Sequence, residues 1–143
     1  MLTSTQKLIK STLKKEIARS VSNDDFYIYV NQTAILRCLT VLQSEPILKF
    51  ASLVDCFAVD FLEQHGYISI YYHLMSYTLH DRLFVVTNIP ADAPAQSITI
   101  VFENANWYER EIFDMFGVSF KDHPDLERIL TPNGYTSFPL RNV

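Results

Sequence analysis

The spacing of hydrophobic positions changes several times along the chain, and each change predicts a different element. Residues 1–21 repeat an apolar side chain every four positions and carry five basic residues against one acid, which predicts an amphipathic basic helix. Residues 26–30 fit a short strand, and residues 33–43 return to helical spacing that stops before Pro46. The first third of the chain is therefore expected to run helix, strand, helix.

The next part of the chain has the two-residue period of strands. Residues 53–61 hold apolar side chains on both faces, interrupted by Asp55 and Asp60, which predicts a central strand covered on both sides. A short turn leads into 67–74, where one side is apolar, and another strand is predicted at 82–87. Three sequential strands joined by short turns favour an antiparallel meander.

The most heavily charged predicted element is a short helix at 106–116. Asn106, followed three residues later by Glu109, fits a capping box, in which each side chain bonds a backbone N–H of the first turn. Gly117 fits the other end, because glycine readily adopts the left-handed conformation that ends helices. The sequence therefore predicts both ends of this helix.

The two sides of this helix differ in charge. At about 100° per residue, Arg110, Glu111 and Asp114 share one arc. The opposite arc is apolar and consists of Tyr108, Ile112, Met115 and Phe116. Glu109 falls on the apolar side, where an unpaired carboxylate is costly to bury, so it is expected to use the capping bond or a basic partner.

Together these patterns predict an α+β fold. The order helix, strand, helix, three strands, helix gives helices packed on a mixed, largely antiparallel sheet. A chain of 143 residues with 48% hydrophobic content is expected to be a single domain, 1–143, in which 118–143 form an extended C-terminal segment. Residues 1–21 fit either a helix docked on this domain or an organelle-targeting segment.

Composition and charge argue against several classes of function. A net charge of -4 gives no electrostatic footprint for nucleic acid, and no stretch approaches the roughly 20 apolar residues of a membrane span. The three glycines lie at separate turns or caps, so neither a P-loop nor a dinucleotide-binding loop is expected. Cys38 and Cys56 lie in apolar surroundings without ligand spacing, and we interpret both as small buried hydrophobic residues.

Candidate catalytic residues are sparse. The four histidines lack the spacings of zinc sites, and His123 is expected to fix the turn before Pro124 or to contact a neighbouring acid. Glu111 and Asp114, three residues apart on one helical face, could supply paired carboxylates for acid–base chemistry or magnesium. This pair is the basis of an alternative hypothesis, a standalone small enzyme that uses the acidic helix.

The charged helix and the residues after it form one long motif. Residues 107–130 run W-Y-E-R-E-I-F-D-M-F-G-V-S-F-K-D-H-P-D-L-E-R-I-L. This string resembles the signature of the thirty-kilodalton (NuoC-type) peripheral-arm subunit of respiratory complex I, the proton-pumping NADH:ubiquinone oxidoreductase. A looser similarity extends upstream through 53–60 and downstream to 139–141. The positions that match the signature are Glu109, Arg110, Glu111, Asp114, Gly117, His123, Pro124, Arg128, Ile129 and Leu130.

The resemblance implies a structural role in an electron-transfer enzyme. The chain would be a non-redox core subunit of the hydrophilic arm and would support assembly and stability of the enzyme that passes electrons from NADH to ubiquinone and pumps protons. Its partner would be the large quinone-site (forty-nine-kilodalton, NuoD-type) subunit. Flavin and iron–sulfur clusters would belong to other subunits, so no cofactor or metal is expected here. The implied location is the matrix side of the mitochondrial inner membrane, or the cytoplasmic face of a bacterial membrane.

The motif also predicts contacts for individual residues. Glu109 and Arg128 are expected to pair, or to share a hydrogen-bond network that holds the helix against the following turn. Charge, tryptophan and arginine gathered in a compact region without an active site are typical of a protein–protein contact. The residues expected at or near a subunit interface are therefore Trp107, Arg110, Glu111 and Asp114. The family also carries a polar tail beyond 139–141 that wraps partner subunits, and we expect a separate polypeptide or other subunits to take its place.

Overall fold

A computed structural model describes residues 2–124, which form both helices and strands. The helices are α1 (Ser4–Thr12), α2 (Ile35–Ser44), α3 (Leu62–His65) and α4 (Ala105–Phe116), with a 3₁₀ helix, η1 (Gln32–Ala34), directly before α2. The strands are β1 (Ile17–Ser22), β2 (Phe26–Val30), β3 (Ser52–Phe61), β4 (Tyr67–Ser76), β5 (Asp81–Pro90), β6 (Ala95–Gln96) and β7 (Phe120–Lys121).

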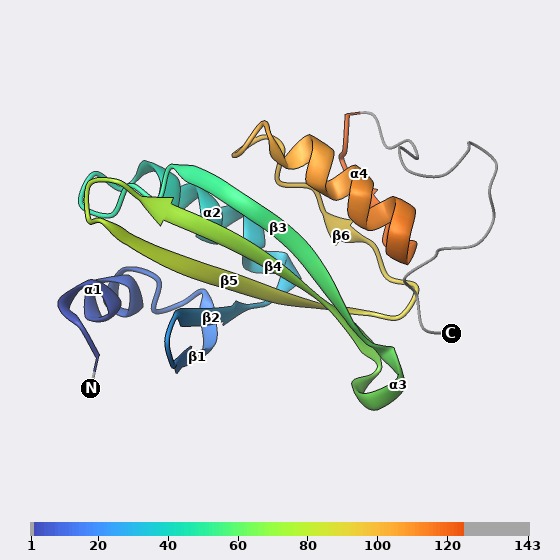
Figure 1. The fold of residues 1–143 in the computed structure, drawn as a ribbon, viewed down its shortest axis with the longest axis horizontal. Helices are drawn as coiled ribbons and strands as arrows, with labels where there is room; N and C mark the ends of the chain where they lie inside the picture. Colours follow the sequence, from blue (N-terminus) through green and yellow to red (C-terminus); the bar gives the residue numbers. More distant parts are fainter. Residues whose placement is uncertain (1, 125–143) are drawn as a thin grey trace.

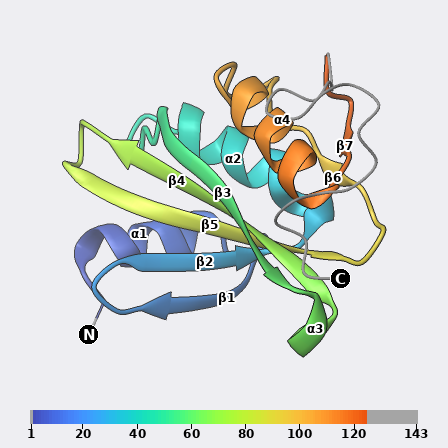
Figure 2. The same ribbon diagram turned by 45° about the vertical axis from the view of Figure 1, so that its right-hand side comes forward.

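The helices cover one face of the main sheet. This sheet has the strand order β1-β2-β5-β4-β3, and β6 and β7 form a separate parallel pair near α4. In Figure 1 and Figure 2, α1, α2 and α4 lie behind or beside the sheet, and no helix crosses in front of β3, β4 and β5. The predicted α+β class is confirmed, and the described residues form one domain around one core.

The three strands predicted to form a meander do so. β3 pairs antiparallel with β4, and β4 pairs antiparallel with β5, which brings Phe57 beside Tyr71 and Tyr71 beside Val86. β2 then adds to the other side of β5 in parallel, with Tyr27 beside Phe84. The sheet is therefore mixed and largely antiparallel, as the sequence predicts.

The N-terminal segment is not one helix over 1–21, and this prediction is wrong. α1 ends at Thr12, and the chain then forms β1, which pairs antiparallel with β2. The helical spacing was misleading because Ile17 and Val21 also suit a strand, where β-branched side chains pack against their neighbours across the hairpin.

β3 is an edge strand and not the central strand that its apolar residues predict. A bulge between Leu53 and Asp55 shifts the register, so that Leu53 and Cys56 both face the core. On the outer face, Phe57 stacks on Tyr71 of β4, with ring centroids 5.0 Å apart. The outer apolar residues therefore contact aromatic neighbours along the sheet rather than a second covering layer.

The core lies between the sheet and the helices. The predicted apolar row of β4 is confirmed, because Ile70, Tyr72 and Leu74 are fully buried. The helices add Ile9 from α1, Ile35, Cys38, Leu39 and Leu42 from α2, and Ala105 and Ile112 from α4. One core therefore joins three helices that are far apart in the sequence, and α4 is part of it.

Aromatic rings line the opposite face of the sheet. Tyr27 stacks on Phe84 at 4.9 Å and meets Tyr71 edge-on at 6.5 Å, while His73 stacks on Phe84 at 4.5 Å. Ring pairs of this kind contribute about 0.5–1.5 kcal/mol each beyond the area that they bury. The rings cover one another and shield the backbone of the sheet on the side that α1, α2 and α4 leave open.

Both cysteines are buried, as predicted, and we expect them to be unreactive in the folded protein. Burial raises the pKa of Cys38 to about 12 and the pKa of Cys56 well above its usual value. Because the thiolate is the reactive form, neither should be labelled by a thiol reagent under native conditions, and both should be labelled in urea. Rapid native labelling of either cysteine contradicts this packing of the core.

Candidate functional site

The predicted charged helix is α4, but its N-terminal cap differs from the prediction. Asn104, and not Asn106, is the N-cap, and its side-chain amide donates to the carbonyl of Leu53 in β3 at 2.9 Å instead of capping the helix. The first N–H groups of the helix bond to carbonyls of the preceding turn. Gly117 ends the helix with φ 77°, as predicted.

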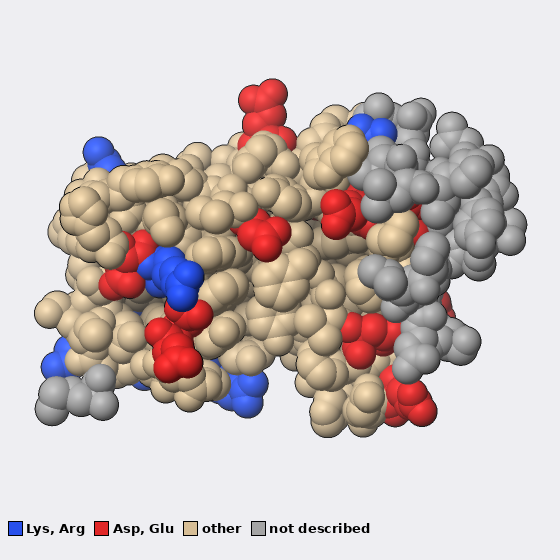
Figure 3. All heavy atoms as spheres, viewed as in Figure 1, with Lys and Arg blue, Asp and Glu red and all other residues tan. Residues whose placement is uncertain are grey.

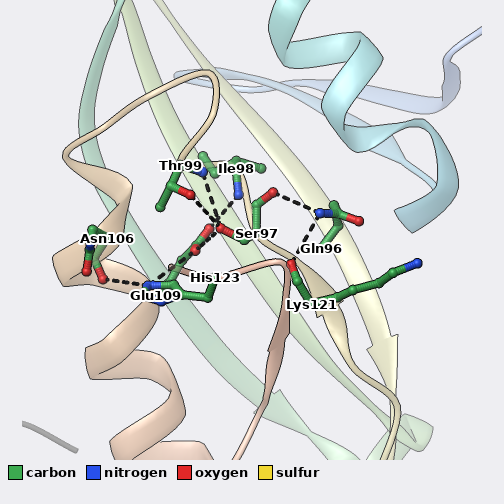
Figure 4. Close-up of polar contacts among 8 residues, drawn as sticks. All are labelled: Gln96, Ser97, Ile98, Thr99, Asn106, Glu109, Lys121 and His123. Carbon is green, nitrogen blue, oxygen red and sulfur yellow. Dashed lines mark hydrogen bonds and ion pairs between the residues drawn. The ribbon is translucent and has the colours of Figure 1, made fainter. Parts of the chain in front are cut away.

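Glu109 is the centre of a buried hydrogen-bond network (Figure 4). Its Oε1 accepts from the hydroxyl of Ser97 at 2.6 Å, and its Oε2 accepts from the backbone N–H of Ile98 at 2.7 Å. The residue is fully buried. The predicted capping box is wrong because this carboxylate bonds the loop at 97–98 and not the N-terminus of its own helix. Glu109 therefore joins α4 to the segment that leads into it.

The surroundings of Glu109 also change its ionisation. Burial raises its pKa to about 7, although the hydrogen bonds from Ser97 and Ile98 act in the opposite direction. Hydrogen bonds to an ionised carboxylate are roughly twice as strong as neutral ones, which limits the cost of ionisation at this site. The carboxyl group of Glu109 consequently keeps its proton to a higher pH than an ordinary surface glutamate does.

His123 lies beside this carboxylate, as predicted. Its side chain is fully buried, and its Nε2 lies 3.8 Å from Oε1 of Glu109 and 3.3 Å from the carbonyl oxygen of Asn106. The imidazole therefore connects the segment after α4 to the first turn of the helix, and it forms an ion pair with Glu109 when it is protonated. Pro124 follows at the surface. Arg128 lies outside the described residues, so its pairing with Glu109 stays a prediction.

Two glutamines that sequence analysis missed connect this region to the main sheet. Gln32 Oε1 accepts from the backbone N–H of Gln96 at 2.6 Å, and Gln32 Nε2 donates to Thr87 Oγ1 in β5 at 3.1 Å. The side-chain amide of Gln96 donates to the carbonyl of Lys121 at 3.2 Å, across the β6–β7 pair. No local pattern marks these residues, because the partners of Gln32 lie 55 and 64 positions away in the sequence.

The residues on the outer side of α4 differ in solvent exposure, whereas the predicted charged arc implies that all of them are exposed. Trp107 is 53% exposed and Glu111 is exposed, whereas Arg110 is half-buried and Asp114 is fully buried. A helical wheel treats these four positions alike, but the tertiary fold covers one of them completely. Glu111 and Asp114 therefore do not face a common solvent-filled space, as paired catalytic carboxylates would have to do.

The structure does not support the alternative of a standalone enzyme built on these carboxylates. Cavities of about 410, 320 and 170 Å³ lie elsewhere, and none of them is lined by Glu111 or Asp114. Within residues 2–124, no group of three or more histidine, cysteine, aspartate or glutamate side chains is arranged to hold a metal ion. None of the helices in this range is both long and apolar enough to cross a membrane.

Residues 2–124 form a small α+β domain in which a buried polar network fixes a charged helix against a mixed sheet. The family model described as "Respiratory-chain NADH dehydrogenase, 30 Kd subunit" matches residues 28–143. The chain belongs to this family, and the resemblance carried by its signature is confirmed.

Similar proteins come from bacteria and mitochondria. An NADH-quinone oxidoreductase subunit from Parvibaculum lavamentivorans is 38% identical over 121 residues, which make up 85% of this chain and 60% of the relative. NADH-ubiquinone oxidoreductase subunit 9 of Reclinomonas americana is 38% identical over 120 residues, or 84% of this chain and 59% of the relative. The probable mitochondrial NADH-ubiquinone oxidoreductase 30.4 kDa subunit of Candida maltosa is 38% identical over 134 residues, which make up 93% of this chain and 49% of the relative. The chain spans about half to three-fifths of the length of these curated relatives.

A solved structure shares the fold. A chain of the membrane-bound sulfane sulfur reductase, an archaeal respiratory membrane complex, superposes with a TM-score of 0.76 at 24% identity. The match covers 92% of this chain and 79% of that chain. The arrangement of sheet and helices described above is therefore also found in a chain of that complex.

The raised pKa of Glu109 predicts a specific loss of stability with pH. The folded protein binds the Glu109 proton with a pKa of about 7, against an ordinary value of 4.5, so its contribution to stability is complete below pH 4.5 and is lost as the pH rises through 7. Glu109→Gln cannot ionise. The wild type is expected to lose about 3 kcal/mol of unfolding free energy over this interval that the variant does not lose. Urea unfolding across the pH range measures the difference.

Glu111→Gln is the matched control, because Glu111 is exposed on the same helix. Its stability is expected to stay within about 0.5 kcal/mol of the wild type at every pH. Parallel pH profiles for the wild type and Glu109→Gln would mean that Glu109 ionises like a surface carboxylate, contrary to its buried position.

Proposed function

We propose that this chain is a non-redox structural subunit in the hydrophilic arm of a complex I-type respiratory enzyme, which passes electrons from NADH to ubiquinone and pumps protons. Its contribution is to the assembly and stability of that arm. The flavin and the iron–sulfur clusters of the enzyme lie in other subunits, and this chain holds no cofactor of its own.

The observation that carries this proposal is the division of the family signature between the two sides of α4. Glu109 is buried with both carboxylate oxygens bonded to Ser97 and Ile98, whereas Trp107 and Glu111 are exposed on the other side. A carboxylate occupied by donors of its own chain supports packing rather than turnover of a substrate. A fixed helix that presents tryptophan and charged side chains to solvent suits contact with another protein.

The partner in this proposal is the large quinone-site (forty-nine-kilodalton, NuoD-type) subunit. The names of the bacterial and mitochondrial relatives support membership of the same kind of assembly, and the partner itself follows from the family resemblance. Trp107, Arg110 and Glu111 lie at or near that contact. Asp114 is fully buried and therefore presents no surface of its own to a partner.

The proposed location is the matrix side of the mitochondrial inner membrane, or the cytoplasmic face of a bacterial membrane. The relatives include a subunit named as mitochondrial and subunits from bacteria, which supports either setting.

Purification through a tag on this chain from its native host tests the proposal. After gentle detergent extraction, the tagged chain is expected to co-purify with subunits that carry flavin and iron–sulfur clusters, and the sample should oxidise NADH with ubiquinone as acceptor. Removal of the chain should abolish the assembled arm on a native gel. Elution as a lone monomer with hydrolase activity, free of flavin and iron, overturns the proposal and favours the standalone enzyme.

A further inference from the structure

Side-chain hydrogen bonds join helix α4 and the edge strand β3 into one unit. The hydroxyl of Tyr108 donates to the carbonyl of Val54 at 3.1 Å, and the side-chain amide of Asn104 donates to the carbonyl of Leu53 at 2.9 Å. Two backbone carbonyls of the edge strand are therefore bonded by side chains from the helix and its cap. We call the outward side of this unit the α4–β3 surface, defined by Val54, Asp55, Phe57, Glu103, Trp107 and Glu111.

The α4–β3 surface exposes large apolar side chains. Trp107 is 53% exposed, Val54 is 42% exposed and Phe57 is 38% exposed. Single exposed apolar residues need no explanation, but several exposed on adjoining elements are typical of a protein contact. Tryptophan in particular is enriched among the residues that dominate binding energy.

The fully exposed charges on this surface are acidic, and Arg110, on the same arc of α4 as Glu111, is half-buried. Asp55, Glu103 and Glu111 are all exposed. Burial, and next the carboxylate of Asp55, raise the pKa of Tyr108, with a smaller effect from Glu111, so two of the acids lie near that ring. Among the ion pairs formed within residues 2–124, the basic partners are Arg37, Arg82 and His123, and none of them contacts these acids. Figure 3 shows acidic side chains at several places over the α4 and β3 region.

This charge pattern restricts what can cover the surface. A second copy of the chain related by a two-fold axis would place acid against acid, which is repulsive. An anionic membrane surface would be repelled for the same reason. A basic protein surface is complementary, because arginine binds carboxylates through two parallel hydrogen bonds and also stacks on tryptophan.

We propose that the α4–β3 surface docks a basic segment of a partner protein, whose arginine or lysine side chains pair with the three acids around an apolar centre at Trp107. The inference rests on the proposed function as a subunit, and it adds where on this chain the contact lies and which chemistry the partner presents. The buried network around Glu109 positions this surface, because it fixes α4 from the opposite side.

Charge reversal in the assembled complex tests the acidic part of the surface. Glu111→Lys is expected to lower the fraction of tagged full-length chain found in the complex on a native gel by roughly tenfold. The matched control is Asp24→Lys, an exposed acid in the turn between β1 and β2 at the opposite edge of the sheet, which changes the net charge equally. The control should assemble like the wild type, and both variants should keep the wild-type melting temperature.

Removal of the Trp107 side chain tests the apolar centre of the surface in the same way. Trp107→Ala is expected to reduce assembly, whereas Tyr77→Ala, which removes a ring that is 68% exposed at the β4–β5 turn, should not. A photo-crosslinking amino acid placed at position 107 in the full chain gives a readout that does not depend on loss of assembly. It is expected to capture a partner peptide rich in arginine or lysine.

Three possible results distinguish failure of the proposed function from failure of this inference. If the wild-type chain does not co-purify with respiratory subunits, the proposed function fails and this inference fails with it. If the wild type assembles and both Glu111→Lys and Trp107→Ala assemble equally well, the surface is wrong while the subunit role stands. Crosslinking to an acidic peptide, to lipid, to a second copy of the chain or to nothing also overturns the inference.

Discussion

The buried carboxylate of Glu109 fixes the charged helix α4 in its position in this domain. Glu109 accepts hydrogen bonds of 2.6 and 2.7 Å from Ser97 and Ile98 and lies beside the buried imidazole of His123. Each buried donor left without an acceptor costs about 1–3 kcal/mol. This cost is a large part of the total stability of a domain, which is about 5–15 kcal/mol. The position of α4 therefore depends strongly on the Glu109 side chain.

The two sides of α4 consequently have different roles. Its inner side joins the core through Ala105 and Ile112 and joins the preceding loop through Glu109. Its outer side presents Trp107 and Glu111 next to the exposed edge of β3. Because the inner contacts leave the helix little freedom, a partner that bound the outer side chains, as we propose, would pay a smaller entropy cost on binding. A fixed helix of this kind accounts for charge and tryptophan concentrated in one short motif.

Features that depend on nearby residues could be predicted from the sequence, and features that depend on distant ones could not. The end of α4 at Gly117 and the meander of β3, β4 and β5 follow from local conformation and short turns. The need of Glu109 for a partner was evident from its position on an apolar arc, but its actual donors come from a loop with no regular period. Gln32 was missed because its partners lie far away in the sequence. The edge position of β3 was missed because stacking on Tyr71 explains outer apolar residues that otherwise suggest a covering layer.

The most direct test of this account is the titration of Glu109 itself. The chemical shift of its side-chain carboxyl carbon, followed by NMR against pH in the folded protein, reports ionisation at that one group. A midpoint near 7 is expected, because burial outweighs the two hydrogen bonds. A midpoint near the ordinary value of 4.5 would show a hydrated carboxylate, and the helix would then have to be held by something other than this buried network.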